Sequence, residues 1–492
     1  MKKTISGVLL TLTAAFSLFA CGKKKTEGTT AAKTTKIKSK KPIEKKNKIV
    51  FYCWNNEFQS RVNDYYSEVN AFDANFTYLM DGNYIEWIPT PNEGGAYQDA
   101  LDKGLNAGNV DMFVFEADYA TKYVKLDKTA NLAGIEGLDM SKQYKYTKDI
   151  VTLGTQIKGT SWQATPGITM YNLKVAKAIW GNNVTTADME TKLSTEANFK
   201  EAAAQVKTNG TTVAGKISKF MMIGPDCWFR MYSNNLHAKM YTEEGTTKSL
   251  KIDRSLLQWA KDTNDFYTSR YIKSVDDDYG LWGSAWGAEQ GKDNCLCIFS
   301  CPWYTDFCLT GNRYNEGEKD TAVGKRTDCN IRLAKSHKGW FWGGTWLTAT
   351  TDGLGKAAIK DSIVSLIKTM TTDKTTLVNI AKGAGDFTNN SDAMDELAAS
   401  NFKYDYFGGQ NPFAYYVASI EGADLSKASD FDQQVAEGIQ SAFRQFFQKN
   451  ITAQAAWEEL KEELATKTKI AATSITLDGT IVGNVITPAT GE

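Results

Sequence analysis

Indole rings, carboxylates and amides recur in this sequence just beyond segments that have the pattern of β-strands. In open α/β sheets, ligands bind outside the carboxyl ends of the strands, so residues at these places are candidates for ligand contact. The candidate ligand-binding residues are Trp54, Asn55, Asn56, Glu57, Glu116, Asp118, Tyr119, Asp226, Trp228, Trp303, Trp342, Gly344 and Trp346.

These side-chain types suit the noncovalent recognition of a sugar. A pyranose has an apolar face of C–H bonds, on which Trp and Tyr stack, and a rim of hydroxyl groups, which carboxylates and amides bind with charge-assisted strength. A buried hydroxyl without a partner is costly, so the polar side chains would also determine specificity. The chain has 13 Trp and 22 Tyr, which is more aromatic surface than a core requires.

Each candidate also has a purely structural explanation. Trp54 could be a core residue at the end of a strand, and Asp118 could cap a helix, since Asp is common near helix starts. Of Trp340, Trp342 and Trp346, we expect at least one to stack on ligand and at least one to lie in the core.

Little in the sequence indicates catalysis or a bound metal. The only histidines are His237 and His337, which leaves little capacity for histidine-based chemistry. No GxGxxG or GxxxxGK[ST] motif follows the strand-like segments, no CxxC pair is present, and no acid–nucleophile motif is recognisable. The sequence therefore predicts a protein that is not an enzyme, with no catalytic residue, no metal and no cofactor.

The cysteines leave their pairing open. Apart from Cys21 there are seven, an odd number, so at least one is unpaired. We expect most of them to be small buried apolar residues, although an exported protein could hold one or two disulfides. They are Cys53, Cys227, Cys295, Cys297, Cys301, Cys308 and Cys329.

The N-terminal segment predicts export and a lipid anchor. An apolar run over residues 5–20 follows two lysines and is too short to span a membrane. Leu18-Phe19-Ala20-Cys21-Gly22 looks like a bacterial lipobox. We therefore expect residues 1–20 to be a lipoprotein signal peptide, and Cys21 to carry fatty acyl chains such as palmitate, which anchor the protein to the membrane.

A lysine-rich segment, residues 21–47, follows the lipobox and contains no aromatic residue. Such a segment cannot bury enough apolar surface to order itself, so we expect a disordered tether. Over residues 49–492, acidic residues exceed basic ones by about 11, although the whole chain has a formal net charge of zero. Phosphate binding needs a basic surface, so no nucleic-acid partner is expected.

Strand and helix patterns alternate at the start of the body. Residues 48–54, 83–91 and 111–116 are predicted strands, and residues 62–72 and 97–105 have apolar side chains at helical spacing. This alternation is typical of a parallel sheet with crossover helices.

Further along, residues 162–173 form an apolar strand that is interrupted at Pro166-Gly167, which suggests a crossing between lobes. Little helix is expected after residue 467, where the chain should lie at the surface. Other strands are predicted at 219–225, 295–304 and 340–350, and helical patterns at 357–370 and 435–464.

Several segments carry a family resemblance together. Residues 97–113 are similar to a pattern "Y…L…AAG..PDIF", with Val110 where proline is usual. Residues 164–172 resemble a "PG..YN" segment, and residues 299–304 resemble "..GPW", with Cys301 in place of glycine. On these motifs and their order, the chain resembles the extracellular solute-binding proteins of ABC carbohydrate importers, the group that includes maltodextrin-binding protein.

The resemblance implies an α/β, periplasmic-binding-protein-like fold. Two α/β lobes with discontinuous domains would be joined by a hinge and would close on the ligand. Residues 48–165 and 338–385 would form lobe 1. Residues 166–337 and 386–492 would form lobe 2, and the C-terminal helices could be shared between the lobes.

The resemblance also implies a function. The protein would be a monomer on the extracytoplasmic face of the cell membrane, anchored by lipid, that captures a carbohydrate, an oligosaccharide in particular. It would deliver this ligand to the permease subunits of an ABC importer. The alternatives are a binding lipoprotein for a peptide or polyamine, a surface glycoside hydrolase, and a surface adhesin.

Overall fold

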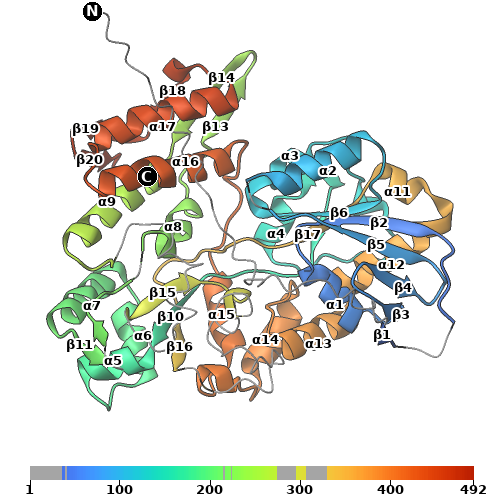
Figure 1. The fold of residues 1–492 in the computed structure, drawn as a ribbon, viewed down its shortest axis with the longest axis horizontal. Coiled ribbons are helices and arrows are strands. Elements are labelled where there is room, and N and C mark those ends of the chain that lie inside the picture. The colour runs from blue at the N-terminus through green and yellow to red at the C-terminus, as the bar shows by residue number, and fades with distance from the viewer. Residues whose placement is uncertain are drawn as a thin grey trace, which may run out of the picture.

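The computed structural model describes residues 36–38, 42–92, 94–213, 216–222, 224–273, 295–305, 328 and 330–491. The predicted signal peptide, Cys21 and most of the predicted tether lie outside the described residues. The described elements form two lobes that lie side by side (Figure 1).

The first lobe is built on an eight-stranded sheet with the order β1-β3-β4-β5-β2-β6-β17-β9. Its strand β2 (Lys48–Cys53) pairs in parallel with β5 (Tyr84–Pro89) and β6 (Met112–Phe115), which confirms the predicted strands and their direction. Helices α1 (Glu57–Tyr65) and α2 (Ala96–Asn106) pack their apolar faces on it. The other strands of this sheet are β1 (Lys36–Ile37), β3 (Val69–Phe72), β4 (Phe76–Leu79), β9 (Thr160–Ser161) and β17 (Trp346–Ala349).

The helix predicted over residues 62–72 is wrong in its second half. Helix α1 ends at Tyr65, and the chain then forms β3, which is antiparallel to β4. The Asp73 carboxylate accepts hydrogen bonds from the backbone N–H groups of Asn75 and Phe76, at 2.9 and 3.0 Å, and so fixes the turn between the two strands. Apolar residues three or four apart do not exclude a strand when a turn-forming Asp comes after them.

The second lobe has a three-stranded antiparallel sheet with the order β15-β10-β16. Strand β15 confirms the strand predicted within residues 295–304, whereas residues 219–225 contribute isolated bridges through Phe220 and Met222. The strands are β10 (Ile168–Asn172), β15 (Cys297–Ser300) and β16 (Ile331–Ala334), with a hairpin of β11 (Thr211–Val213) and β12 (Lys216–Ser218). The helices are α5 (Leu173–Trp180), α6 (Thr186–Leu193), α7 (Glu196–Thr208), α8 (Asp226–Ser233) and α9 (Arg254–Thr268).

The helical pattern predicted over residues 435–464 corresponds to two helices, α16 (Asp432–Phe447) and α17 (Ala453–Thr468). The chain leaves α16 through Lys449, whose φ of 65° is left-handed, and the Thr452 side chain accepts a hydrogen bond from the Ala455 N–H to start α17. After α17 the expected scarcity of helix holds, and short strands bury their isoleucines. The strands after α17 are β18 (Ile475–Leu477), β19 (Gly479–Val482) and β20 (Val485–Pro488). Strand β18 pairs in parallel with β14 (Thr247–Ile252), which forms a hairpin with β13 (Tyr241–Glu244).

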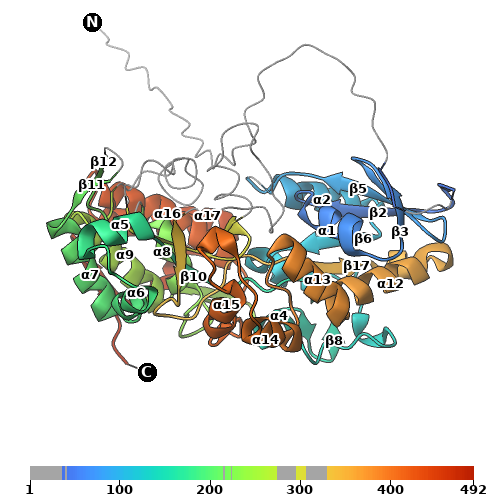
Figure 2. The same ribbon diagram turned by 90° about the horizontal axis from the view of Figure 1, so that it is seen from below.

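The remaining helices include α12, which confirms the helix predicted over residues 357–370. In Figure 2, α13, α14 and α15 come one after another from the first lobe toward the second. The bounds are α3 (Ala120–Val124), α4 (Lys145–Asp149), α11 (Thr351–Gly355), α12 (Ala357–Thr372), α13 (Lys374–Ala384), α14 (Ser391–Ala399) and α15 (Pro412–Ile420), with the small hairpin β7 (Thr152–Leu153) and β8 (Gln156–Ile157).

The chain passes from the large sheet to the small one between β9 and β10, and returns between β16 and β17. The Pro166-Gly167 break lies on the first crossing. There the N–H of Gly167 donates to the carbonyl of Trp340 on the returning segment, at 2.7 Å. A side-chain carbon at Gly167 would lie 1.9 Å from the Trp340 ring, so glycine is required for the two crossings to touch.

The cysteines whose side chains are described confirm the expectation of small buried residues. Cys53, Cys295, Cys297 and Cys301 are each at most 1% exposed. Burial raises the pKa of the Cys53 thiol to about 12, which keeps it protonated and unreactive. The side chain of Cys227, and the residues Cys308 and Cys329, lie outside the described part of the chain.

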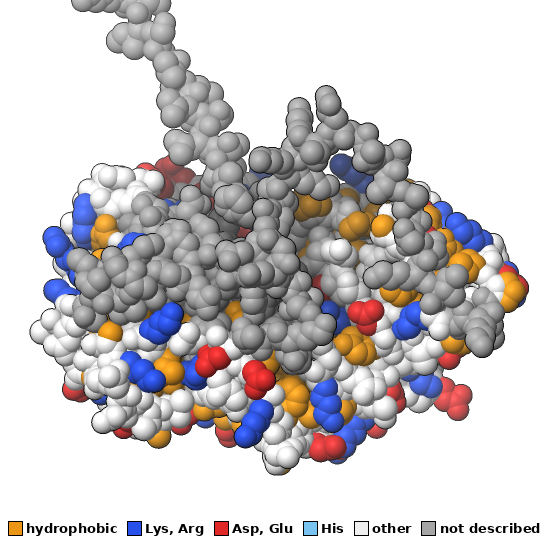
Figure 3. All heavy atoms as spheres, turned by 60° about the horizontal axis from the view of Figure 1, so that its bottom comes forward, with side chains coloured by type: hydrophobic (Ala, Val, Ile, Leu, Met, Phe, Trp, Pro, Cys, Tyr) orange, Lys and Arg blue, Asp and Glu red, His pale blue; other side chains and the backbone are white. Residues whose placement is uncertain are grey.

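The surface carries charges of both signs. Figure 3 shows Lys and Arg side chains interspersed with Asp and Glu over the face in view. Among the described helices, none is long and apolar enough to cross a membrane.

Candidate functional site at the boundary between the lobes

Asp118 of the first lobe and Arg230 of the second are joined by a two-pronged ion pair. Asp118 lies in the short 3-10 turn Ala117–Tyr119, directly after β6, and Arg230 lies on α8. The guanidinium Nη1 and Nη2 donate to the two carboxylate oxygens at 2.6 and 2.5 Å. Their side chains are 22% and 19% exposed, so the pair is largely shielded from water.

Two indole rings adjoin this ion pair. The Arg230 guanidinium lies 5.5 Å from the centre of the Trp342 ring, which is a cation–π distance. The Trp303 ring meets the Trp342 ring edge to face, with centres 5.1 Å apart and planes at 71°. The Trp303 Nε1–H donates to the backbone carbonyl of Trp342 at 3.1 Å, which fixes the orientation of the pair.

Side chains from both lobes lie close to Gly343. Its φ of 67° is left-handed, a conformation that glycine adopts without strain. A carbon added at its Cα would lie 3.6 Å from Glu116 Oε1 and 3.7 Å from Trp303 Nε1. A carboxyl group and an indole N–H, from segments far apart in sequence, therefore converge beside Gly343.

The Glu116 carboxyl is electrostatically unusual. Burial and the nearby Asp118 raise its pKa, while Arg230 opposes the rise and Glu437 adds to it, and the resulting pKa is about 8. At neutral pH the group is therefore mostly protonated, and it can both donate and accept a hydrogen bond.

Tyr119 adds a second polar group beside Glu116. Its side chain is 4% exposed, and its hydroxyl has no hydrogen-bond partner among the described residues. Burial, with a contribution from Glu116, raises the pKa of the phenol well above its usual value, so the hydroxyl stays protonated. A buried hydroxyl without a partner can accept or donate a bond to a ligand.

The group past β2 lies at the carboxyl end of the neighbouring strand. Trp54 is half-buried and meets Tyr97 edge to face, with ring centres 5.7 Å apart. Asn55 Oδ1 accepts a hydrogen bond from the Glu57 N–H at the start of α1, and Asn56 is exposed. Since β2 and β6 are adjacent and parallel, these residues and Glu116 lie along one edge of the sheet.

Two of the predicted site residues lie in the core. Trp228 is 2% exposed and donates its N–H to Thr263 Oγ1. Trp346 is fully buried, stacks on Phe115 with planes 12° apart, and donates its N–H to the carbonyl of Thr147. The ring and the N–H group of each indole contact other protein groups, and the structure does not bring either indole to the boundary between the lobes.

Gly344 and Asp226 are the two predicted site residues that remain. Gly344 has a φ of 112°, and an added carbon there would lie 3.0 Å from the Trp346 ring, so it serves packing. Asp226 begins α8, and its side chain lies outside the described part of the structure. Sequence reasoning missed Arg230, although it comes four residues after Asp226 and so falls on the same face of a helix.

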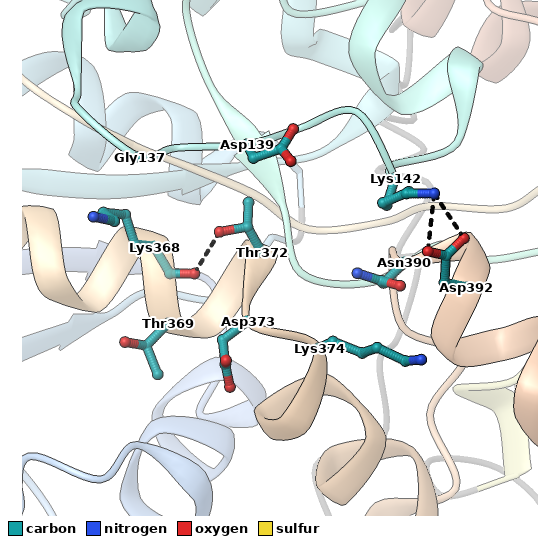
Figure 4. A pocket seen from close by; sticks show the side chains of 10 residues that line it. All are labelled: Gly137, Asp139, Lys142, Lys368, Thr369, Thr372, Asp373, Lys374, Asn390 and Asp392. Atoms are coloured by element: carbon teal, nitrogen blue, oxygen red, sulfur yellow. Dashed lines mark hydrogen bonds and ion pairs between the residues drawn. The ribbon is translucent and has the colours of Figure 1, made fainter.

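A surface depression of about 480 Å³ lies elsewhere in the molecule. Figure 4 shows lysines and acids around it, including the ion pair between Lys142 and Asp392. No aromatic ring lines it, so it does not offer the stacking surface expected for a sugar. A smaller cavity of about 60 Å³ borders Asp118 and Arg230.

Within the described ranges, no group of His, Cys, Asp and Glu side chains could hold a metal ion.

No protein-family model matches the sequence, and the search among curated proteins found no match. Solved structures are similar in fold. A structure described as extracellular solute-binding protein family 1 has a TM-score of 0.63 and 14% identity, covering 86% of this chain and 99% of its own. The GacH receptor of Streptomyces glaucescens has a TM-score of 0.60 and 13% identity, covering 87% and 99%.

A third similar structure is the ABC transporter associated binding protein of Bifidobacterium animalis subsp. lactis. Its TM-score is 0.58 at 14% identity, covering 87% of this chain and 99% of that one. The near-complete coverage of these chains confirms the predicted architecture. The chain has the two-lobed, periplasmic-binding-protein-like α/β fold of the extracellular solute-binding proteins of family 1.

Proposed function

We propose that the protein captures a carbohydrate, an oligosaccharide in particular, and delivers it to the permease of an ABC importer. The observation that carries this proposal is the convergence of Glu116, Trp303 and Trp342 beside Gly343, at the boundary between two lobes. Proteins of similar fold support it. The GacH receptor was solved with acarbose, and a Bifidobacterium longum binding protein of an ABC transporter was solved with lacto-N-biose.

The side chains explain how a sugar would be held. The indoles of Trp303 and Trp342 offer ring surface to a C–H face, while the protonated Glu116 and the Tyr119 hydroxyl offer donors and acceptors to the hydroxyl rim. Trp54, Asn55, Asn56 and Glu57 extend this surface along the sheet edge. Because Asp118 and Arg230 neutralise each other and Glu116 is protonated, the site suits an uncharged ligand.

We place the protein at the extracytoplasmic face of the membrane, held by acyl chains on Cys21 and by the predicted tether. The tether is shorter than the predicted residues 21–47, because Lys36 and Ile37 pair with β3 as strand β1 of the large sheet. Two acyl chains give stable anchoring, and the lysines add attraction to anionic lipid. The folded body would then act as a monomer within reach of the permease, and it would bind its ligand without altering it.

A thermal-shift panel tests the ligand class. Mono- and oligosaccharides, peptides and polyamines are each added to the purified body, and a ligand at about 100 times its Kd should stabilise the fold by about 2.7 kcal/mol. Stabilisation by sugars alone supports the proposal. Stabilisation by a peptide or polyamine alone, or the release of new reducing ends from an oligosaccharide, contradicts it.

A further inference from the structure

The lobes touch away from the crossing segments through paired side chains. Asp118 and Arg230 form one such contact, and Lys125 of α3 with Asp430 forms a second, with the Lys125 Nζ 2.7 Å from both carboxylate oxygens. Asp430 lies two residues before α16, which packs on α9 in the second lobe. A third contact joins Gln98 to Gln433 at 3.2 Å. The three contacts run from the first lobe to α8 and to the start of α16.

The contacts differ in strength. The pair of Asp118 and Arg230 is bidentate, charge-assisted and about four-fifths buried, and Trp342 covers the guanidinium. Pairs of this kind are strong, and a partner left behind in a dry site is costly. Lys125 and Asp430 are 53% and 31% exposed, so water and salt screen that pair.

We propose that Asp118 and Arg230 form a latch that holds the two lobes closed before any ligand binds, with Lys125 and Asp430 as a weaker outer contact. When the lobes separate, Arg230 loses its carboxylate partner, so opening must break the ion pair. The latch biases the open–closed equilibrium of the empty protein. A ligand then binds to lobes that already touch each other, and its apparent affinity depends on this bias.

Small-angle X-ray scattering on the ligand-free protein tests the latch. Asp118→Asn and Arg230→Gln each remove the ion pair, and each should increase the radius of gyration, with the ratio of open to closed molecules rising by about tenfold or more. The double variant should open no further than either single variant, because both remove the same interaction. Lys125→Gln should produce a smaller opening.

Asp478→Asn is the matched control. Asp478 pairs with Arg254 and Lys251 inside the second lobe, and the Asp478 and Arg254 side chains are each 16% exposed. The substitution therefore removes partly buried ion pairing that does not cross the boundary. Opening in the Asp118 and Arg230 variants, with the control unchanged, supports the latch. Scattering curves that match the wild type, or equal expansion in the control, overturn it.

Circular dichroism shows whether Asp118→Asn and Arg230→Gln still fold. If either substitution prevents folding, the exposed Lys125→Gln variant still provides a readout. In that case the wild type and Lys125→Gln are compared at low and high salt. High salt should separate the lobes slightly in the wild type, because it screens the ion pair between Lys125 and Asp430. It should have a smaller effect on Lys125→Gln, which lacks that ion pair. Identical curves in all four conditions contradict an ionic latch. No ligand is present in these measurements, so they stand whether or not the protein binds sugar.

Discussion

Glu116 and Trp303 border the same space from opposite lobes, with the carboxyl oxygen and the indole nitrogen both within reach of a carbon placed on Gly343. The first residue lies just after a strand of the large sheet, and the second lies just after a strand of the small one. A ligand that touches both would therefore join the lobes, which is the geometry that a closing binding protein needs.

Glu116→Gln should flatten the pH dependence of stability. The folded protein keeps a proton on Glu116 up to a pKa of about 8, whereas an unfolded glutamate releases it above its ordinary 4.5. The free energy of unfolding should thus fall as the pH rises from about 4.5 to about 8, and level off above. Urea denaturation at a series of pH values measures the slope. The exposed Glu136→Gln should keep the wild-type slope, and an unchanged slope in Glu116→Gln would refute the raised pKa.

Removing an indole at the boundary should weaken sugar binding. Trp303→Ala and Trp342→Ala each delete ring surface beside Gly343, so we expect the Kd for the sugar found in the thermal-shift panel to rise by about tenfold or more. Isothermal titration calorimetry measures the Kd. Trp180→Ala on α5, whose ring N–H is bonded to Gln205, is the control and should bind normally. Equal affinity in all three variants would exclude the two indoles from the site.

Trp346→Ala should destabilise the fold. The ring is fully buried against Phe115 and its N–H is bonded to Thr147, so the substitution leaves a cavity and an unpaired carbonyl. Removal of such a side chain costs about 3–5 kcal/mol. Thermal unfolding monitored by circular dichroism measures the loss. A melting temperature within a degree of the wild type would show that the ring is not part of the core.

Gly167→Ala should strain the crossing between the lobes. The added carbon would collide with the Trp340 ring, which is 1% exposed and held by a bond to Ser336. Overpacking of this kind costs about 1–3 kcal/mol or more. Chemical denaturation should show the loss, and the double variant Gly167→Ala with Trp340→Leu should recover part of it. Full stability of the single variant would contradict this close approach.

Cys21→Ala should abolish lipid attachment. Without the sulfur no acyl chain can be added, so the protein should lose incorporation of labelled palmitate and leave the membrane fraction. Ser17→Ala, four residues upstream, should retain both. Labelling of the Cys21→Ala protein at the wild-type level would disprove the assignment of the anchor.

The sequence by itself determined the parallel strands β2, β5 and β6 and the glycine crossing at Gly167. These features depend on local patterns: runs of β-branched and aromatic residues, turn-forming residues, and a Pro-Gly break. It also placed Glu116 and Asp118 at the carboxyl edge of the sheet, because they come directly after a strand whose direction the pattern predicts. The two-lobed fold was predicted from the family resemblance, which the order of the motifs along the chain supports.

Only the tertiary structure decided which side chains meet. Trp342 lies at the boundary and Trp346 lies in the core, although the two are four residues apart, because the strand β17 that begins at Trp346 is covered by neighbours on both faces. The pairing of Asp118 with Arg230 joins residues 112 positions apart. Such a contact depends on how two separately folded lobes face each other, and no local pattern in the sequence encodes that relationship.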